Sequence, residues 1–222
     1  MSRVFKKTPP CYFAPFRLAG VVIGLLAILL LPGSIADSAA HSPDDMVVVG
    51  LLPPAEPAEL GPNAVPQLFA LLSQCPARLK ERERWEIAAA IEAEARHWGY
   101  DPLFVLAMVE VESGCSPRAR GTHGSLGLLQ MIPDTADAMA REANLPELTE
   151  TSLTRPVVSL HLGLRYLVQL ERELGDPHLA LAAYNMGPGR VAQLGRKRAR
   201  NARYVHKILE RYEELLAAPL AV

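Results

Sequence analysis

Residues 102–115 read PLFVLAMVEVESGC, an apolar run that ends in two acids, Glu110 and Glu112. Asp101 precedes the run as a helix-capping residue, and Pro102 suits the first position of a helix. Because Leu, Phe, Val, Ala and Met follow one another without a polar face, the run predicts a helix that is buried on all sides. The rest of the domain is therefore expected to fold around this helix.

The two acids at the end of the run are unusual for such a helix. Burial and the negative end of the helix dipole both disfavour a charged carboxylate, so the pKa of either acid is expected to rise. An acid that stays protonated near neutral pH can act as a general acid. Helical periodicity does not choose between Glu110 and Glu112. The alternative for either, which composition alone favours, is a carboxylate that reaches solvent or forms a salt bridge.

Helical patterns continue on both sides of this run. Apolar spacing, proline starts and glycine stops predict further helices. They are expected at residues 67–74, 81–98, 134–144, 156–175, 178–185 and 201–216, with a short turn at 192–195. Strand alternation is absent apart from a small irregular hairpin expected between residues 120 and 131. The predicted fold class is all-α with minimal β, in a domain that spans residues 67–216.

The first 40 residues read as a targeting segment. Basic residues precede an uncharged apolar run at Leu18–Leu31, and Pro32 and Gly33 end the run before a series of small residues. That order predicts a secretory signal peptide at residues 1–40, because the run is short for a membrane span. The alternative is an uncleaved anchor that tethers the protein to a membrane through residues 18–31. The domain is expected in the periplasm or another extracytoplasmic space, behind a proline-rich linker at residues 41–66.

Export bears on the interpretation of the cysteines. Cys11 lies within the targeting segment, which leaves Cys75 and Cys115 as an even pair in an oxidising compartment. Each lies beside turn residues, so we expect a disulfide between them; two free buried thiols are the alternative. The spacing of cysteine and histidine fits no zinc pattern, and neither a metal nor a cofactor is expected.

The charge balance of the chain excludes one class of partner. The formal net charge is −1, from 23 Lys and Arg against 24 Asp and Glu, which does not suit nucleic-acid binding. We expect a monomer. Six Lys and Arg between Arg190 and Arg203, with no acid among them, would suit acidic peptides or a partner. A solvated basic face is the simpler interpretation.

Two later stretches also carry polar side chains in apolar or turn-rich surroundings. In GTHGSLGLLQMIPDTA, residues 121–136, Gln130 is one amide among apolar residues; a bound sugar or the protein backbone would satisfy it. In AAYNMGPGR, residues 182–190, Tyr184 and Asn185 end a helix before a Gly-Pro-Gly turn. A tyrosine ring and an amide suit a sugar, although the same pattern is typical of a helix C-cap.

Taken in order, ESGCSP, GLLQMIPDTA and AYNMGPG resemble the soluble lytic transglycosylase family, the SLT domain, which is related to goose-type lysozyme. The resemblance covers about residues 80–212. It implies a lysozyme-like, mostly helical fold that binds the glycan strands of peptidoglycan.

Matched positions carry the family's roles to single residues. Glu112 matches the catalytic acid of the Glu-Ser motif. Positions that bind substrate or line the site in the family correspond to Ser113, Gln130, Tyr184, Asn185 and Tyr204. This chain departs from the pattern at Gly121, where many members carry serine, and at Leu129, which replaces methionine. The role of the missing serine must then pass to Thr122 or Ser125, or be lost.

The resemblance also implies a mechanism with one carboxyl group instead of the usual two. Glu112 would protonate the β-1,4 bond between N-acetylmuramic acid and N-acetylglucosamine and then deprotonate the muramoyl 6-hydroxyl, which leaves a 1,6-anhydro end. A muramidase of the same fold would need a second carboxylate to position water. Asp134 is the first candidate, but it is expected to serve as a helix N-cap. A non-catalytic peptidoglycan-binding assembly protein is the third hypothesis.

Overall fold

The structure is a computed structural model, and it describes residues 64–149 and 151–218 of the 222-residue chain. The predicted signal peptide or anchor at residues 1–40 lies outside the described residues. So does the predicted linker at residues 41–66, except for its last three positions. Within the described ranges, no helix is both long and apolar enough to cross a membrane.

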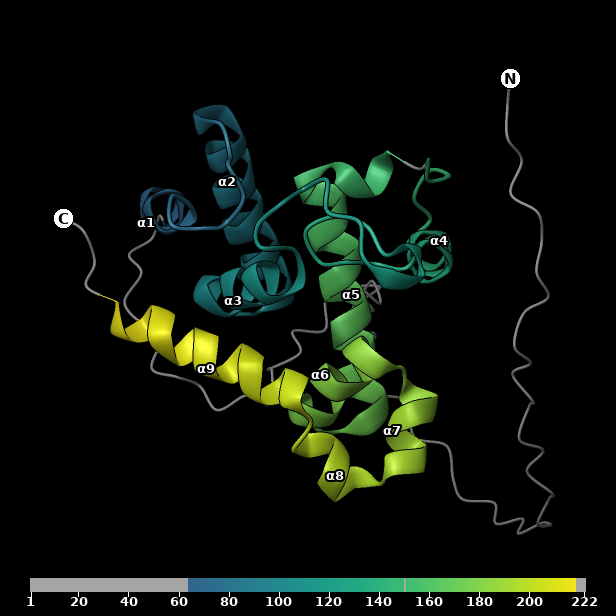
Figure 1. The fold of residues 1–222 in the computed structure, drawn as a ribbon. Helices are drawn as coiled ribbons and strands as arrows, with labels where there is room; N and C mark the ends of the chain where they lie inside the picture. The colour runs from purple at the N-terminus through teal and green to yellow at the C-terminus, as the bar shows by residue number, and fades with distance from the viewer. Residues whose placement is uncertain (1–63, 150, 219–222) are drawn as a thin grey trace, which may run out of the picture. The chain divides into compact units, whose positions relative to one another are not determined.

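The described residues form nine α-helices and two short 3₁₀ turns (Figure 1). The helices are α1 (Val65–Leu72), α2 (Glu81–Trp98), α3 (Pro102–Ser113), α4 (Pro133–Glu142), α5 (Pro156–Leu174), α6 (Pro177–Met186), α7 (Pro188–Leu194), α8 (Arg196–Arg200) and α9 (Arg203–Ala217). The 3₁₀ turns are η1 (Thr122–Gly124) and η2 (Ser152–Thr154). In the same residues, β structure is limited to isolated bridges that pair Leu126 with Arg120 and Met131. The all-α prediction with a small irregular hairpin is confirmed.

Helix α3 is the buried centre that its sequence predicts. The seven side chains from Leu103 to Val109 are each at most 2% exposed. Helices α2 and α9 contact α3, and Figure 1 shows α9 running alongside it. The carboxylate of Asp101 accepts a hydrogen bond from the Leu103 amide at 2.7 Å, which confirms the predicted cap. At the other end, Gly114 adopts the left-handed conformation that closes the helix.

The chain between α6 and α9 is more helical than predicted. In place of one short turn at residues 192–195, it forms α7 and α8. Pro188 lies in the first turn of α7, and Gly195, at φ 79°, separates the two helices. A proline start and a glycine stop so close together define helices too short to show a periodic apolar pattern, so the sequence did not reveal them.

The end of α3 is tied to the segment that precedes α2. A disulfide joins Cys75 and Cys115, whose Cα atoms are 6.0 Å apart, and the Ala77 amide donates to the Gly114 carbonyl at 3.2 Å. Cys115 has a φ of 67°, a left-handed backbone that costs a non-glycine residue about 1–3 kcal/mol. Since this residue follows the C-cap of α3 directly, the cross-link holds the helix end that carries the two acids.

We expect the Cys75–Cys115 bridge to stabilise the protein by about 2–4 kcal/mol, because it closes a loop of 40 residues in the unfolded chain. The double variant Cys75→Ser/Cys115→Ser should lower the free energy of unfolding by that amount in urea. A reducing agent should have the same effect on the wild type and none on the double variant. If the reducing agent leaves the wild type unchanged, the two cysteines are free thiols.

Candidate active site

Glu112 lies in the last turn of α3, half-buried, and meets the start of α9. The Tyr204 hydroxyl donates to Glu112 Oε1 at 2.5 Å. Burial raises the pKa of Glu112 to about 7, while the hydrogen bond from Tyr204 and the positive charge of Lys207 act in the opposite direction. At neutral pH this carboxyl group is therefore populated in both its protonated and its ionised form.

The neighbouring acid Glu110 has a different environment. Its Oε2 pairs with the guanidinium of Arg211 on α9, and Arg211 also contacts Glu214 at 2.7 Å. Glu110 is thus the acid for which the salt-bridge interpretation holds. The hydrogen-bond partner of Glu112 is the hydroxyl of Tyr204, not a cation. The structure distinguishes the two acids where helical periodicity could not.

Helix α9 is held against α3 at three points, which explains how Tyr204 reaches Glu112. Besides the contacts of Tyr204 and Arg211, the Tyr212 hydroxyl donates to Asp101 Oδ2 at 3.0 Å. Arg211 and Tyr212 belong to no motif, so sequence reasoning missed them. They follow Tyr204 at helical spacing, seven and eight residues later, and that spacing was the available signal.

Tyr184 lies deeper in the same region. Its hydroxyl donates to the Leu129 carbonyl at 2.8 Å, and its ring centroid is 5.6 Å from that of Tyr166. Burial, followed by the negative charge of Glu112, holds the pKa of Tyr184 well above its usual range. Asn185, at the end of α6, is exposed. The predicted pair thus divides into a half-buried tyrosine near the acid and an exposed amide.

Gln130 is satisfied by the protein in this structure. Its amide nitrogen donates to the carbonyls of Gly127, at 2.9 Å, and Ala119, at 3.3 Å, and its Oε1 accepts from the Ser125 hydroxyl at 2.9 Å. These bonds fit the structural alternative raised by the sequence. Ser113 also bonds locally, because its hydroxyl donates to the Val109 carbonyl at 2.9 Å.

Close packing explains why this chain has glycine at position 121, where many relatives of the resembled family carry serine. A Cβ atom at Gly121 would collide with Gln130 Oε1 and Ser125 Oγ. Ser125 fills this space from the opposite side of the hairpin and donates to Gln130. Of the two candidates named from the sequence, Ser125 is the one that contacts the glutamine, so the hydroxyl near Gln130 comes from position 125.

We expect Gly121→Ser to lower the free energy of unfolding by about 1–3 kcal/mol, because the added atoms overpack a hydrogen-bonded site. Gly121→Ser/Ser125→Ala should recover more than half of that loss by freeing the space of the second hydroxyl. Urea denaturation of the two single variants and the double variant measures the coupling. Additive losses would show that Ser125 does not occupy the place of the missing serine.

The expected cap at Asp134 is wrong. The N-cap of α4 is Ile132, Pro133 takes the first helical position, and no side chain caps the helix. Asp134 is exposed in the first turn of α4, where its negative charge interacts favourably with the positive end of the helix dipole. The proline moved the helix start one residue earlier than the aspartate suggested.

One group in the described ranges brings three potential metal-ligand atoms within 4.8 Å of one another: Cys75, Glu110 and Cys115. Both sulfur atoms belong to the disulfide, and Glu110 pairs with Arg211. These side chains are therefore engaged with protein partners.

Comparison with known proteins places these residues in a family. The family described as Transglycosylase SLT domain matches residues 89–207, more than half of the chain, and this range includes α3, the hairpin, α6 and Tyr204. The chain belongs to the SLT domain family. The predicted resemblance is confirmed, and with it the lysozyme-like all-α fold.

Individual relatives share this SLT domain. The soluble lytic murein transglycosylase of Salmonella typhimurium is 31% identical over 90 residues, 40% of this chain and 14% of the relative. The membrane-bound lytic murein transglycosylase C of Actinobacillus pleuropneumoniae is 30% identical over 110 residues, 45% of this chain and 30% of the relative. The crystal structure of an inactive mutant of the lytic transglycosylase Slt from Pseudomonas aeruginosa matches with a TM-score of 0.51 and 30% identity. That match covers 59% of this chain and 24% of the other. The chain thus spans between 14% and 30% of the length of these relatives.

Proposed function

We propose that this SLT domain is a peptidoglycan lytic transglycosylase. It cleaves the β-1,4 bond between N-acetylmuramic acid and N-acetylglucosamine and leaves a 1,6-anhydromuramoyl end. Membership of the family and the names of the relatives support this activity. The observation that carries the proposal is the environment of Glu112, a half-buried carboxyl group whose pKa is raised to about 7 beside Tyr204.

A pKa near neutrality suits a group that must act twice. Protonated Glu112 donates its proton to the glycosidic oxygen as the bond to the anomeric carbon breaks. The carboxylate then accepts the proton of the muramoyl 6-hydroxyl, whose oxygen forms a bond to the anomeric carbon. Glu112 ends the cycle protonated, and no water is consumed.

The surroundings of the acid support a single-carboxylate mechanism. In the part of the chain that the structure describes, two groups shift the pKa of Glu112 besides burial. They are Tyr204 and Lys207, and neither is a carboxylate. Glu110 is engaged by Arg211. A hydrolase of the standard kind would need a second carboxylate to position or replace the attacking water.

We assign supporting roles to the remaining matched residues. Tyr204 orients the Glu112 carboxyl, and Asn185 supplies an exposed amide to the sugar next to the scissile bond. Tyr184 and Gln130 shape the site from inside the protein, through the Leu129 carbonyl and the hairpin. Ser113, next to the acid, donates to the Val109 carbonyl and so stabilises the last turn of α3.

The same proposal places the domain outside the cytoplasm, as a monomer exported by residues 1–40 or tethered through residues 18–31. Peptidoglycan lies outside the cytoplasm, so an enzyme that cleaves it must be exported. A bridge between Cys75 and Cys115 is stable in such an oxidising compartment.

The products of digestion test the proposal. Purified sacculi incubated with the protein should release muropeptides that are lighter by one water than the products of a muramidase and that resist borohydride reduction. Reducible ends of hydrolysed mass would show a muramidase instead. If the wild type releases no more product than Glu112→Gln, the domain is a non-catalytic peptidoglycan-binding protein.

A further inference from the structure

Two histidines lie side by side where α2 contacts α5. His97 is in the last turn of α2 and His161 is in the second turn of α5, and their ring centroids are 5.6 Å apart. Imidazole nitrogen is a favoured ligand of zinc and copper ions. With Zn–N bonds of about 2.0–2.1 Å, two imidazoles that share one zinc ion have centroids roughly 5 Å apart. The observed separation is close to that of a shared ion.

The carboxylate of Glu94 fixes the orientation of the His161 ring. Glu94 Oε2 accepts a hydrogen bond from His161 Nδ1 at 2.9 Å, and both side chains are partly buried. Since a carboxylate has no hydrogen to donate, Nδ1 carries the proton, and the lone pair of the neutral ring is on Nε2. Histidines that bind metals usually have such a carboxylate on the nitrogen that does not bind the ion. Among the described residues, Nε2 of His161 has no hydrogen-bond partner, so it is available to a ligand.

His97 and Trp98 form the rest of this surface cluster. His97 is exposed, so its ring can change rotamer rapidly and turn a nitrogen toward His161. The ring centroid of Trp98 is 4.6 Å from that of His97 and 5.4 Å from that of His161. The indole Nε1 of Trp98 is buried and has no hydrogen-bond partner within the described ranges. A buried donor without an acceptor costs stability, and a water molecule held beside the rings by an ion would relieve that cost.

We propose that His97 and His161 bind one divalent transition-metal ion of the zinc and copper class, with Glu94 as the carboxylate that positions His161. Water completes the coordination, because the site is at the surface. The ion joins α2 to α5 and stabilises the folded state by binding to it. Glu94 and His161 are 67 residues apart in the chain, so no metal-binding spacing is evident in the sequence. The inference rests on the contacts between these two helices and not on the proposed activity.

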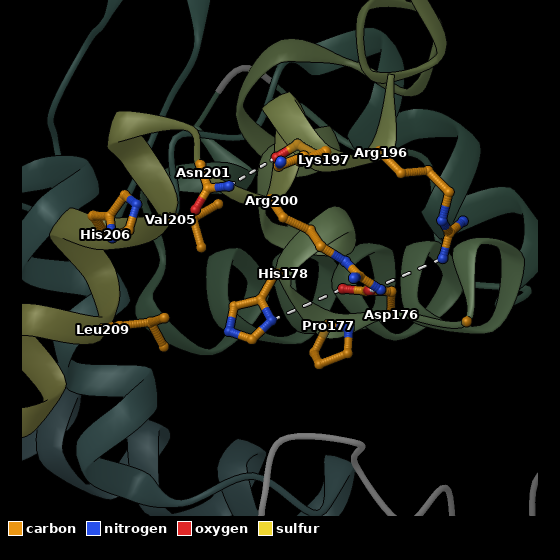
Figure 2. A pocket seen from close by; sticks show the side chains of 11 residues that line it. Asp176, Pro177, His178, Arg196, Lys197, Arg200, Asn201, Val205, His206 and Leu209 are labelled. Carbon is orange, nitrogen blue, oxygen red and sulfur yellow. Dashed lines mark hydrogen bonds and ion pairs between the residues drawn. The ribbon is translucent and has the colours of Figure 1, made fainter. Parts of the chain in front are cut away.

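A second pair of histidines provides a matched control. Figure 2 shows His178 of α6 and His206 of α9 in the lining of one hollow. Three cations line the same hollow: Arg196, Lys197 and Arg200. Its carboxylate, Asp176, is 3.9 Å from His178 Nδ1 but is engaged by Arg200 and by the Leu179 amide. Because positive charge repels a metal ion, this pair is not expected to bind one.

Calorimetric titration of the full chain with Zn²⁺ tests the proposal, on protein without a histidine tag and without reducing agent. The wild type should bind one ion, and His97→Gln and His161→Gln should each abolish that binding. Glu94→Gln should raise the Kd about 10–100-fold, as expected for a carboxylate behind a metal ligand. The control His178→Gln/His206→Gln should leave the Kd unchanged. Zn²⁺ should also raise the Tm of the wild type and of the control, but not that of His97→Gln.

Tryptophan fluorescence locates the bound ion. The chain has two tryptophans, so Trp85→Phe leaves Trp98 as the reporter beside the two histidines. Cu²⁺ quenches an indole that lies close to it. Titration of Trp85→Phe with Cu²⁺ should therefore quench the emission of Trp98, and excess Zn²⁺ should restore it. Trp85→Phe/His97→Gln should show no such quenching.

The outcomes distinguish a metal site from simple packing of rings. A wild type without saturable Zn²⁺ binding would overturn the proposal and leave the cluster a packing contact between α2 and α5. Binding that persists in both His97→Gln and His161→Gln, or that is equally lost in the control, would also overturn it. Since His97 is exposed, His97→Gln should remain folded, and circular dichroism without added metal establishes this. Peptidoglycan cleavage enters none of these readouts, so a failure of the metal site is distinguishable from a failure of the proposed activity.

Discussion

Glu112→Gln is expected to lower the rate of peptidoglycan cleavage by about 10²–10⁴-fold, the usual contribution of a general acid. The amide keeps the shape of the side chain and can still contact Tyr204, but it can neither donate nor recover the proton. Rates of release of soluble muropeptides from sacculi, at saturating and subsaturating substrate, measure the effect. A loss confined to kcat would show that substrate binding is intact.

The same substitution is expected to stabilise the protein, with a dependence on pH that can be derived. The pKa of Glu112 is about 7 in the folded chain and near 4.5 when exposed, so the folded state binds more protons between these values. Stability is therefore lost as pH rises from about 4.5 to 7. Glu112→Gln removes that loss, on the order of 1–3 kcal/mol above pH 7, and should give little benefit at pH 4.

Glu110→Gln is the matched control, two residues away on the same helix. It breaks the ion pair with Arg211 and should lower stability by about 1–3 kcal/mol while activity stays within a few-fold of the wild type. The two variants thus have opposite signatures. If Glu110→Gln were the inactive variant and Glu112→Gln the active one, the assignment of the acid would be wrong.

Tyr204→Phe is the second change with a large expected effect. A hydrogen bond to a charged group contributes about 1.5–3 kcal/mol, so loss of the bond to Glu112 should reduce activity at least ten-fold. The bond also lowers the pKa of Glu112, and its removal should raise that pKa further above about 7. The alkaline limb of the pH–rate profile should therefore move to higher pH.

Tyr212→Phe distinguishes this role from simple packing of α9. It removes the hydrogen bond to Asp101 on the same pair of helices and should cost about 0.5–1.5 kcal/mol of stability. It should leave the midpoint of the alkaline limb in place. An equal shift of that midpoint in both variants would show that Tyr204 acts only by holding α9.

Much of the fold could be predicted because its signals are local. Asp101, Pro102 and Gly114 mark the ends of α3, and an apolar run without a polar face defines its burial. Asp176 and Pro177 mark the start of α6 in the same way. Where the signals crowd together, around Pro188 and Gly195, the prediction merged two helices into one turn.

The sequence proposed the residues of the candidate site but could not supply their partners. The motif around Glu112 favoured this acid over Glu110. Its pairing with Tyr204, 92 residues later in the chain, depends on how α9 packs against α3, which no local signal predicts. Arg211 is the clearest omission, because nothing in the sequence around an arginine on an amphipathic helix indicates which acid it will pair with. The hydrogen bonds of Gln130 likewise depend on backbone carbonyls that a hairpin brings together.

The protonation state of Glu112 is the central claim, and infrared spectroscopy can measure it directly. The carboxylic acid C=O band that is present in the wild type and absent in Glu112→Gln should disappear with a midpoint near pH 7 as the pH is raised. A midpoint near 4.5, the value of an exposed glutamate, would contradict the claim that burial between α3 and α9 keeps this acid ready to donate its proton.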